Sequence, residues 1–171
     1  MPAPSLLSVG TAQPVGYAGA LVDMGEPHDI TTAVNESATA LDFGQVCVRG
    51  VAVAAGAVQN VKPQTADGDA IAGVTMAAPS DIVAASDGTV TYARYKALPV
   101  LKKGRIYVVP CENVVAGTAA LVITAGTGSK IASTTGGAAG AGRIAIPGGS
   151  VWETTTTTAS GVPGILNLNI P

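Results

Sequence analysis

The stretch from Leu98 to Pro110, LPVLKKGRIYVVP, is the clearest β-structure signal in the chain. Apolar residues precede Lys102-Lys103-Gly104-Arg105, and the residues after Gly104 alternate between two faces. Ile106 and Val108 share one face, and Arg105, Tyr107 and Val109 share the other. Alternation with a period of two, carried by β-branched and aromatic residues, is typical of a strand. We therefore predict a hairpin of two strands bent around Gly104, with Lys-Lys-Gly-Arg at its tip.

The rest of the chain consists of short apolar segments separated by Gly, Pro, Asp and Ser, and no amphipathic helix is predicted. Val51–Ala57 is apolar and Ala-rich, but it is short and contains Gly56, so a strand or irregular structure is predicted there. Residues 125–142, almost entirely Gly, Ala, Ser and Thr, are predicted to be a loop with little to pack. Further strands are predicted at 17–23, 29–32, 45–49, 70–76, 89–96, 119–124, 143–146, 150–154 and 165–170, with Asp-Gly turns at 67–68 and 87–88.

This pattern predicts an all-β fold: a single β-barrel or sandwich of jelly-roll or tulip-like type, with about ten short strands. A chain of 171 residues fits one domain. Residues 1–16, MPAPSLLSVGTAQPVG, carry three prolines and no periodicity. We expect an extended N-terminal arm there, stiffened by proline, and a β domain over residues 17–171.

Charge and hydropathy exclude several classes of protein. The net charge of −2 gives no basic footprint for nucleic acid. No apolar run approaches the roughly 18 residues that a membrane span needs, and the start of the chain lacks the basic region of a secretory signal. Charged residues make up only 12 % of the chain, so other subunits are expected to cover much of its surface. Cys47 and Cys111 are predicted to be buried free thiols.

Candidate catalytic, cofactor and metal motifs are weak. A lone His28 cannot supply a two-histidine metal site, and no G-x-S-x-G elbow accompanies it. Residues 126–130 (GTGSK) do not fit the P-loop pattern, and residues 136–142 (GGAAGAG) do not fit a dinucleotide finger. Asp67 and Asp69 make a weak calcium site at best, and a solvated turn is the favoured interpretation. We predict no enzyme, no cofactor, no metal ion and no small-molecule substrate.

Two features have both a structural and a functional interpretation. Lys102, Lys103 and Arg105 form the one basic cluster; it either blocks edge pairing at a solvated hairpin tip or makes a salt-sensitive contact with an acidic partner. Trp152 is the single tryptophan; a place in the core is favoured over an exposed contact, although interfaces are enriched in exposed Trp.

The order of six motifs resembles the structural cement, or capsid decoration, proteins of tailed bacteriophages. These motifs are GYAGALVDMG (16–25), NES followed by ALDFGQVCVRG (within 35–50), AIAGVTM (70–76), VLKKGRIYVV (100–109), IPGGSVWET (146–154) and LNLNIP (166–171). Each motif is unspecific alone, being Gly plus apolar residues, and their order carries the resemblance. It covers the chain from Gly16 except for the Gly- and Thr-rich stretches 125–142 and 154–163.

The resemblance implies a non-enzymatic virion protein without a cofactor, made in the bacterial host cytoplasm and bound to the outer surface of the capsid. Its partners would be the major capsid protein, whose capsomers it bridges, and itself, as a homodimer or homotrimer at a local symmetry axis. The arm is expected to become ordered on the shell or on an adjacent subunit. The candidate contacts are Leu6, Leu7, Val9, Val15, Tyr17, Lys102, Lys103, Arg105 and Trp152.

A tail- or fibre-associated β module and a carbohydrate-binding domain remain the alternatives. Sugar sites usually need exposed aromatic side chains. One Trp and four Tyr are few for that purpose.

Overall fold

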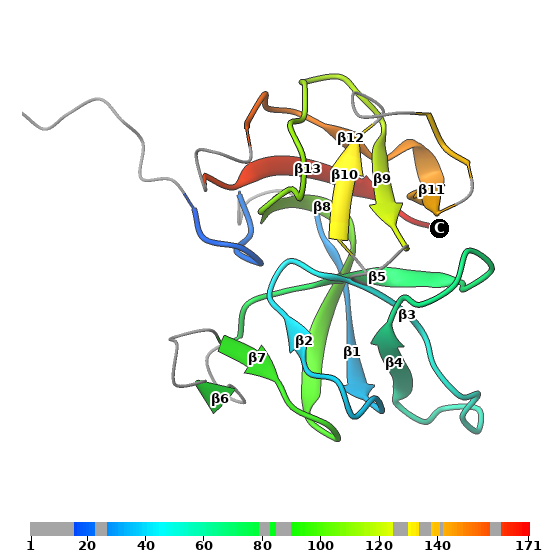
Figure 1. Ribbon diagram of the computed structural model, residues 1–171. Coiled ribbons are helices and arrows are strands. Elements are labelled where there is room, and N and C mark those ends of the chain that lie inside the picture. Colours follow the sequence, from blue (N-terminus) through cyan, green and yellow to red (C-terminus); the bar gives the residue numbers. More distant parts are fainter. Residues whose placement is uncertain are drawn as a thin grey trace, which may run out of the picture.

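The computed structural model describes residues 16–22, 27–78, 83–84, 90–124, 130–133, 138–140, 142–157 and 162–171. The regular structure of these residues is almost all β-strand, joined by loops and turns, with one 3-10 turn among them at Pro147–Gly149 (Figure 1). The strands are β1 (Asp29–Asn35), β2 (Leu41–Asp42), β3 (Val46–Arg49), β4 (Gln59–Pro63), β5 (Ile71–Thr75), β6 (Val83–Ala84), β7 (Val90–Tyr92), β8 (Ala97–Val108), β9 (Ala120–Ile123), β10 (Lys130–Ser133), β11 (Arg143–Ala145), β12 (Val151–Trp152) and β13 (Gly164–Asn169). The all-β prediction is confirmed.

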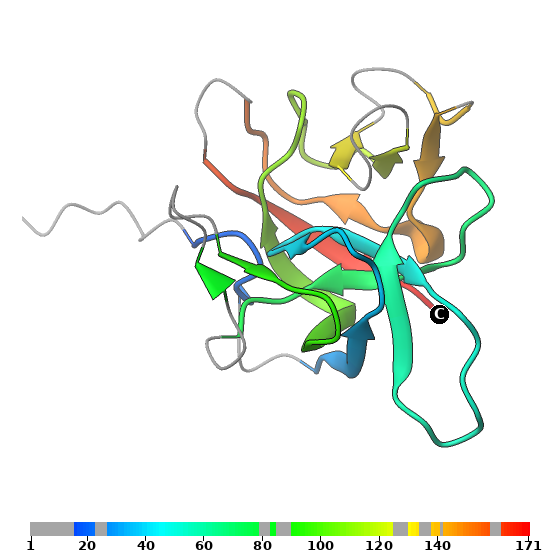
Figure 2. The ribbon, with the colours of Figure 1, turned by 60° about the horizontal axis from the view of Figure 1, so that its bottom comes forward.

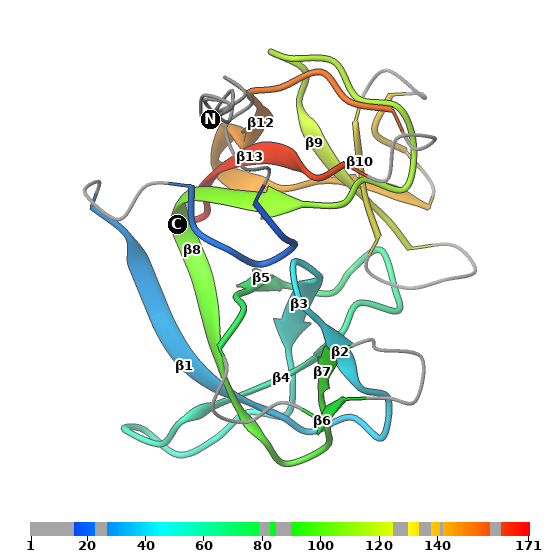
Figure 3. The ribbon, with the colours of Figure 1, turned by 90° about the vertical axis from the view of Figure 1, so that its left-hand side faces the viewer.

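A closed barrel forms the lower half of the molecule. Its strands follow the order β1-β4-β3-β5-β8, and β8 closes the barrel by pairing antiparallel with β1. The β1–β4 pair is parallel, and the other pairs are antiparallel. The small sheet β2-β7-β6 lies beside this barrel, whereas β13, β12 and the sheet β10-β9-β11 form the upper half (Figures 1 and 3).

Strand β8 belongs to both halves. Residues 97–103 pair with β1 in the barrel, and residues 103–108 pair with β13 in the upper half. The strand bends between these two partners, as Figure 3 shows. The register with β1 shifts between Asp29 and Ile30, and Gly104 has a φ of +126°, which a side chain would rarely tolerate. A bulge and a glycine together are the usual means of bending a strand.

The predicted hairpin at Leu98–Pro110 is therefore wrong, although the predicted bend at Gly104 is present. The stretch is one continuous strand whose two halves pair with β1 and β13 rather than with each other. The residues Lys-Lys-Gly-Arg lie within this strand, at its bend, and not at a hairpin tip.

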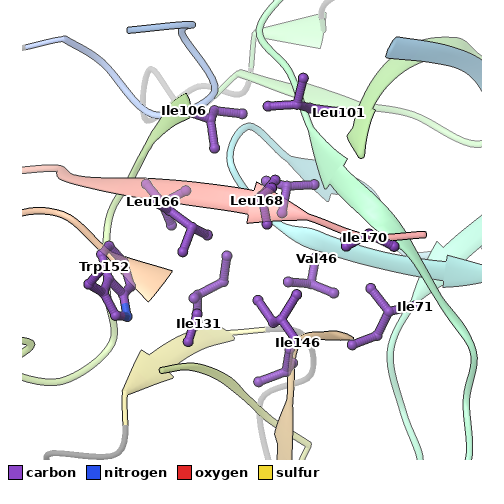
Figure 4. Close-up of a cluster of buried hydrophobic side chains, with 14 of the residues drawn as sticks. Val46, Ile71, Leu101, Ile106, Ile131, Ile146, Trp152, Leu166, Leu168 and Ile170 are labelled. Carbon is purple, nitrogen blue, oxygen red and sulfur yellow. The ribbon is translucent and has the colours of Figure 1, made fainter. Parts of the chain in front are cut away.

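Two hydrophobic cores share one wall, made by β3, β5 and β8. Neighbouring residues of these strands face opposite ways: Val100 belongs to the barrel core and Leu101 to the upper core. Cys47 and Ala72 likewise face the barrel, and Val46 and Val74 face the upper core. Figure 4 shows the upper core, where Ile131 and Ile146 lie below Leu166 and Leu168, and Trp152 lies at one end of the cluster. Strands that are buried on both faces carry continuous apolar sequence, as β5 does.

Most predicted strands are confirmed, with small shifts at their ends. In β13, Leu166 and Leu168 are buried, and Asn167 and Asn169 lie on the more exposed face. The turn at Asp67-Gly68 is also present. Residues 51–58 form an irregular loop between β3 and β4, as the sequence allowed.

Several predictions were wrong. The Gly-rich stretch 125–142 contains β10, whose Ile131 and Ala132 are buried. Strand β4, which ends at Lys62-Pro63, was not among the predicted strands. The strand expected at 89–96 ends at Tyr92 and is followed by a turn. The segment predicted as a strand at 17–23 makes a single bridge, from Leu21 to Ile106. The turn at 87–88 and residues 1–15 of the arm lie outside the described residues.

Replacing Gly104 tests whether the bend of β8 holds the fold together. A Cβ at this position would lie 2.4 Å from His28 Nδ1, and the backbone φ of +126° disfavours any side chain. We expect Gly104→Ala to lower the free energy of unfolding by about 1–3 kcal/mol. Chemical denaturation measures this difference.

Gly68→Ala is the matched control, because nothing lies within 4 Å of a Cβ there and its φ is not positive. It should change the free energy of unfolding by no more than about 1 kcal/mol. Equal effects of the two substitutions would contradict the role given to Gly104.

Candidate interaction surface

The root of the N-terminal arm lies against the second half of β8. The amide of Gly19 donates to Tyr107 O at 2.8 Å, and the amide of Tyr107 donates back to Ala20 O at 2.9 Å. Gly16 packs so closely on the Tyr107 ring that a Cβ would lie 2.1 Å from it. Tyr17, a predicted contact residue, is 66 % exposed next to this root. The structure therefore fixes where the arm leaves the domain.

The arm residues predicted to contact a partner, Leu6, Leu7, Val9 and Val15, lie outside the described residues. Their role remains a prediction, which the described root makes easier to test. Because the root is fixed to the domain by backbone hydrogen bonds, the arm starts from a defined place on the surface.

The three residues of the predicted basic cluster, Lys102, Lys103 and Arg105, differ in their exposure and in their partners. Lys103 is exposed at the bend of β8, and Lys102 and Arg105 are half-buried. The guanidinium of Arg105 forms an ion pair with Glu153 at 2.6 Å. The other carboxylate oxygen of Glu153 accepts a hydrogen bond from Asn167 Nδ2 at 2.9 Å. Arg105 thus joins β8 to Glu153, the residue after β12, and Glu153 in turn binds β13, so a good part of the bonding capacity of Arg105 is used inside the chain.

Trp152 lies in the upper core and is fully buried. Its indole Nε1 donates to Ala132 O at 2.9 Å, which ties β10 to β12. The interpretation of Trp152 as a core residue is confirmed. Because no part of the ring reaches the surface, the prediction that Trp152 contacts a partner is wrong.

The loop between β3 and β4, residues 51–58, was not selected from the sequence as a contact. Its sequence is VAVAAGAV, and all eight residues are exposed. Val51 is 70 % exposed. The available signal was an apolar run without strand alternation and without a charged residue, placed directly after the strand that ends at Arg49. Such a run has no obvious place in a core, which makes surface exposure the alternative.

Glu36 fixes the root of this loop. Its carboxylate accepts the amide of Val51 at 3.0 and 3.1 Å, and the amide of Gly50 donates to Asn60 O at 2.8 Å. A Cβ on Gly50 would lie 2.4 Å from the Glu36 carboxylate, so glycine leaves the space that this contact needs. The carbonyl of Glu36 accepts Arg94 Nε at 3.1 Å. One residue therefore connects the loop to the turn between β7 and β8.

The turn between β7 and β8 carries an exposed aromatic ring. Tyr95 is 69 % exposed and has a φ of +63°, which is uncommon for a residue other than glycine. Its amide donates to Asn35 O at 2.6 Å, and the guanidinium of Arg94 lies over its ring at 4.6 Å from the centroid. Asn35 is fully buried, and its Nδ2 donates to the carbonyls of Thr39 and Tyr92. The buried amide of Asn35 holds this turn in place.

The carboxylates of Asp67 and Asp69 accept hydrogen bonds from backbone amides and from threonine hydroxyls. Hydrogen bonds from the Thr124 hydroxyl and the Gly142 amide lower the pKa of Asp67, and they join the β4–β5 loop to the upper half. Bonds from the amides of Thr65 and Ala66 lower the pKa of Asp69. This arrangement agrees with the solvated turn favoured from the sequence.

The two thiols are free, as predicted. Burial raises the pKa of the Cys47 thiol to about 12, so it stays protonated at neutral pH. Burial also raises the pKa of Cys111, which is half-buried rather than fully buried.

His28 is half-buried, with its ring beside Gly104. Within the described part of the chain, no group of three or more His, Cys, Asp and Glu side chains could hold a metal ion. No helix among those residues is long and apolar enough to cross a membrane.

Two comparisons find proteins that are similar to this chain. The family model described as "Structural cement protein (E217 gp24/Pam3 gp6)" matches residues 7–169. A chain in the solved structure "The capsid of Myoviridae Phage XM1" superposes with a TM-score of 0.65 over 95 % of both chains, at 13 % sequence identity. At that identity the likeness shows a shared fold. No curated protein matches the sequence.

Acid should loosen the connection that Asp67 makes. A carboxyl whose pKa is lowered in the folded state stabilises the fold above its unfolded pKa, and that stabilisation is lost as the pH falls through the folded pKa. We expect the melting temperature of the wild type to fall more than that of Asp67→Asn between about pH 5 and about pH 3. Thermal melts followed by circular dichroism measure this, and parallel curves would contradict the connection.

Proposed function

Because the chain belongs to the family of structural cement proteins, we propose that it binds the outer surface of a tailed-phage capsid, bridges neighbouring capsomers of the major capsid protein and stabilises the mature head. The observation that carries this proposal is the family match over residues 7–169, which includes both cores and most of the arm. Family membership makes the chain a structural protein associated with the capsid, and a catalytic role is not part of the proposal.

Several properties of the chain support binding to a large surface. Few residues are charged, and exposed apolar side chains occur at the arm root, in the β3–β4 loop and in the turn at Tyr95. Exposed apolar groups near one another mark surfaces that bind other proteins. Many copies on one shell, each with modest contacts, give firm overall attachment. A sugar-binding role is not favoured, because the single Trp is buried.

The arm is the first contact that we propose. Residues 1–16 carry Leu6, Leu7, Val9 and Val15, and their sequence offers them no local partner. The backbone bonds of Gly19 and Ala20 to Tyr107 give this segment a fixed origin on the domain. The arm becomes ordered on the shell or on an adjacent cement subunit, and Tyr17 and Lys103 contribute near the domain. Association of the subunits as a homodimer or homotrimer is part of the same proposal.

Undecorated capsids give the direct test of the function. We expect the purified protein to sediment with such capsids at saturating, stoichiometric occupancy, and to raise the temperature at which the capsids release their DNA. Bridging makes shell opening require the loss of contacts on several capsomers at once. An unrelated β protein of similar charge is the control. Absence of binding to the capsids would contradict the function.

Deleting residues 2–14 tests the arm. Because this deletion leaves Gly16 and the bonds to Tyr107 in place, the domain should keep its melting temperature. We expect capsid occupancy at a fixed protein concentration to fall at least about tenfold, the loss that about 1.4 kcal/mol of contact energy produces. Unchanged occupancy would show that the arm is not a contact.

A further inference from the structure

We propose that the β3–β4 loop and Tyr95 form a second shell-contact surface, which binds an apolar patch bordered by carboxylates on the capsid exterior. We call residues 51–58 together with Tyr95 the apolar apex. This inference rests on the proposed function and adds to it the surface on the domain itself that meets the shell. It is separate from the arm and uses residues that neither core needs.

The composition of the apolar apex is difficult to explain by folding alone. Eight consecutive residues, VAVAAGAV, lie in water without a polar side chain among them. Val51, Val53 and Val58 are all exposed, and Tyr95 is about as exposed as Val51. Single exposed apolar residues are ordinary, but apolar residues gathered at one place mark an interaction site. Tyr and Arg, present here as Tyr95 and Arg94, are also the residues most enriched at binding hot spots.

The root of the β3–β4 loop and the turn at Tyr95 are held in place by hydrogen bonds within the chain. Glu36 bonds to the amide of Val51 with its carboxylate and to Arg94 with its carbonyl. Asn35 bonds to the amide of Tyr95 and, through its buried side chain, to the carbonyl of Tyr92. These bonds fix both the loop root and the turn. A contact surface that is already ordered loses less conformational entropy on binding, so more of its contact energy appears as affinity.

The charged residues around the apolar apex indicate which kind of protein surface binds there. Arg49, Arg94 and Lys96 are exposed around the apolar apex, and the nearby carboxylate of Glu36 is occupied by Val51 N–H. Among the described residues beside the apolar apex, three cations stand against one carboxylate, which makes this described surface positive on a chain whose net charge is −2. Two copies that paired through this surface about a two-fold axis would bring the same cations together, which is unfavourable. A surface of a different protein, with carboxylates around an apolar centre, would be complementary to the apolar apex. Under the proposed function, that protein surface is the capsid shell.

The position of the apolar apex fits bridging. Figures 1 and 3 place the β3–β4 loop and the β7–β8 turn at the same end of the molecule, away from the sheet β10-β9-β11. Figures 1 and 2 place the arm root, residues 16–22, on the opposite side from the β3–β4 loop. A subunit with contacts on two sides can bind two places on a shell. The arm and the apolar apex are therefore the two ends of the bridge.

Replacing valine by serine in the loop tests this inference. In Val51→Ser/Val53→Ser/Val58→Ser the side chains stay small and exposed, so the fold should be unchanged. We expect its affinity for undecorated capsids, measured by co-sedimentation, to fall at least about tenfold. Val109→Ser/Val115→Ser is the matched control, because Val109 is as exposed as Val58, at 50 %, and lies in the β8–β9 connection. The control should bind like the wild type.

Two further variants separate the ring and the charges. Tyr95→Asn removes the ring but tolerates the left-handed backbone, so it should also weaken capsid binding. Arg49→Glu/Lys96→Glu should weaken binding and reduce its dependence on salt, whereas Lys130→Glu, exposed in the upper half, should not.

The outcomes distinguish this inference from the proposed function. If the wild type does not bind capsids, both are wrong. If the wild type binds and the triple serine variant binds equally well, only the apolar apex is wrong. Sedimentation of the free protein tests whether a second copy binds this surface instead. If the wild type is an oligomer that dissociates in the triple serine variant, and the shell affinity of each subunit is unchanged, the surface binds a second copy and the inference is wrong.

Discussion

The structure depends on one strand that serves two cores. Strand β8 closes the barrel by pairing with β1, and after its bend at Gly104 it becomes the partner of β13. Val100 and Leu101, adjacent in the chain, face the barrel core and the upper core respectively. The two halves therefore share a wall instead of meeting at a polar interface, and neither core is complete without β8. Chains poor in aromatic residues bury little area per side chain, so sharing a wall between two cores gives a larger buried surface than two separate modules would.

The sequence predicts the strands better than their partners. Alternation of side chains identifies β13 correctly, because Leu166 and Leu168 lie on the buried face and Asn167 between them does not. The same local signal gives the wrong answer at Leu98–Pro110, since a hairpin and a bent strand have the same alternation on either side of a glycine. What distinguishes them is the identity of the pairing strands, β1 and β13, and these come from distant parts of the chain. Strand β10 was missed because its pairing with β9 and the bond from Trp152 to Ala132 outweigh the Gly- and Thr-rich composition around it.

The sequence also predicts the family of the protein better than its individual contact residues. Composition and motif order are properties of the whole sequence, and they lead to the capsid family without any geometry. Individual contact residues require knowledge of exposure, which local sequence does not give. Trp152 and the VAVAAGAV loop show this in opposite directions: the large aromatic ring is buried, and the small apolar residues are exposed. Arg105 could not be separated from Lys103 by sequence, because its ion pair is with Glu153, a residue 48 positions away in the chain.

The polar groups explain why an apolar surface can stay exposed on a stable domain. Asn35, Glu36, Asp67 and Asp69 are used mainly to satisfy backbone groups in loops, and Arg105 and Arg143 pair with Glu153 and Glu112. A chain with 12 % charged residues thus commits many of them to holding its loops and strands. Few charges remain to solvate the surface, and the exposed charged residues described near the β3–β4 loop include Arg49, Arg94 and Lys96. Such a domain gains by being covered, because burying apolar loops that are already ordered costs little conformational entropy. In the function that we propose, a capsid offers that cover in many identical copies, and multivalent binding makes the attachment firm.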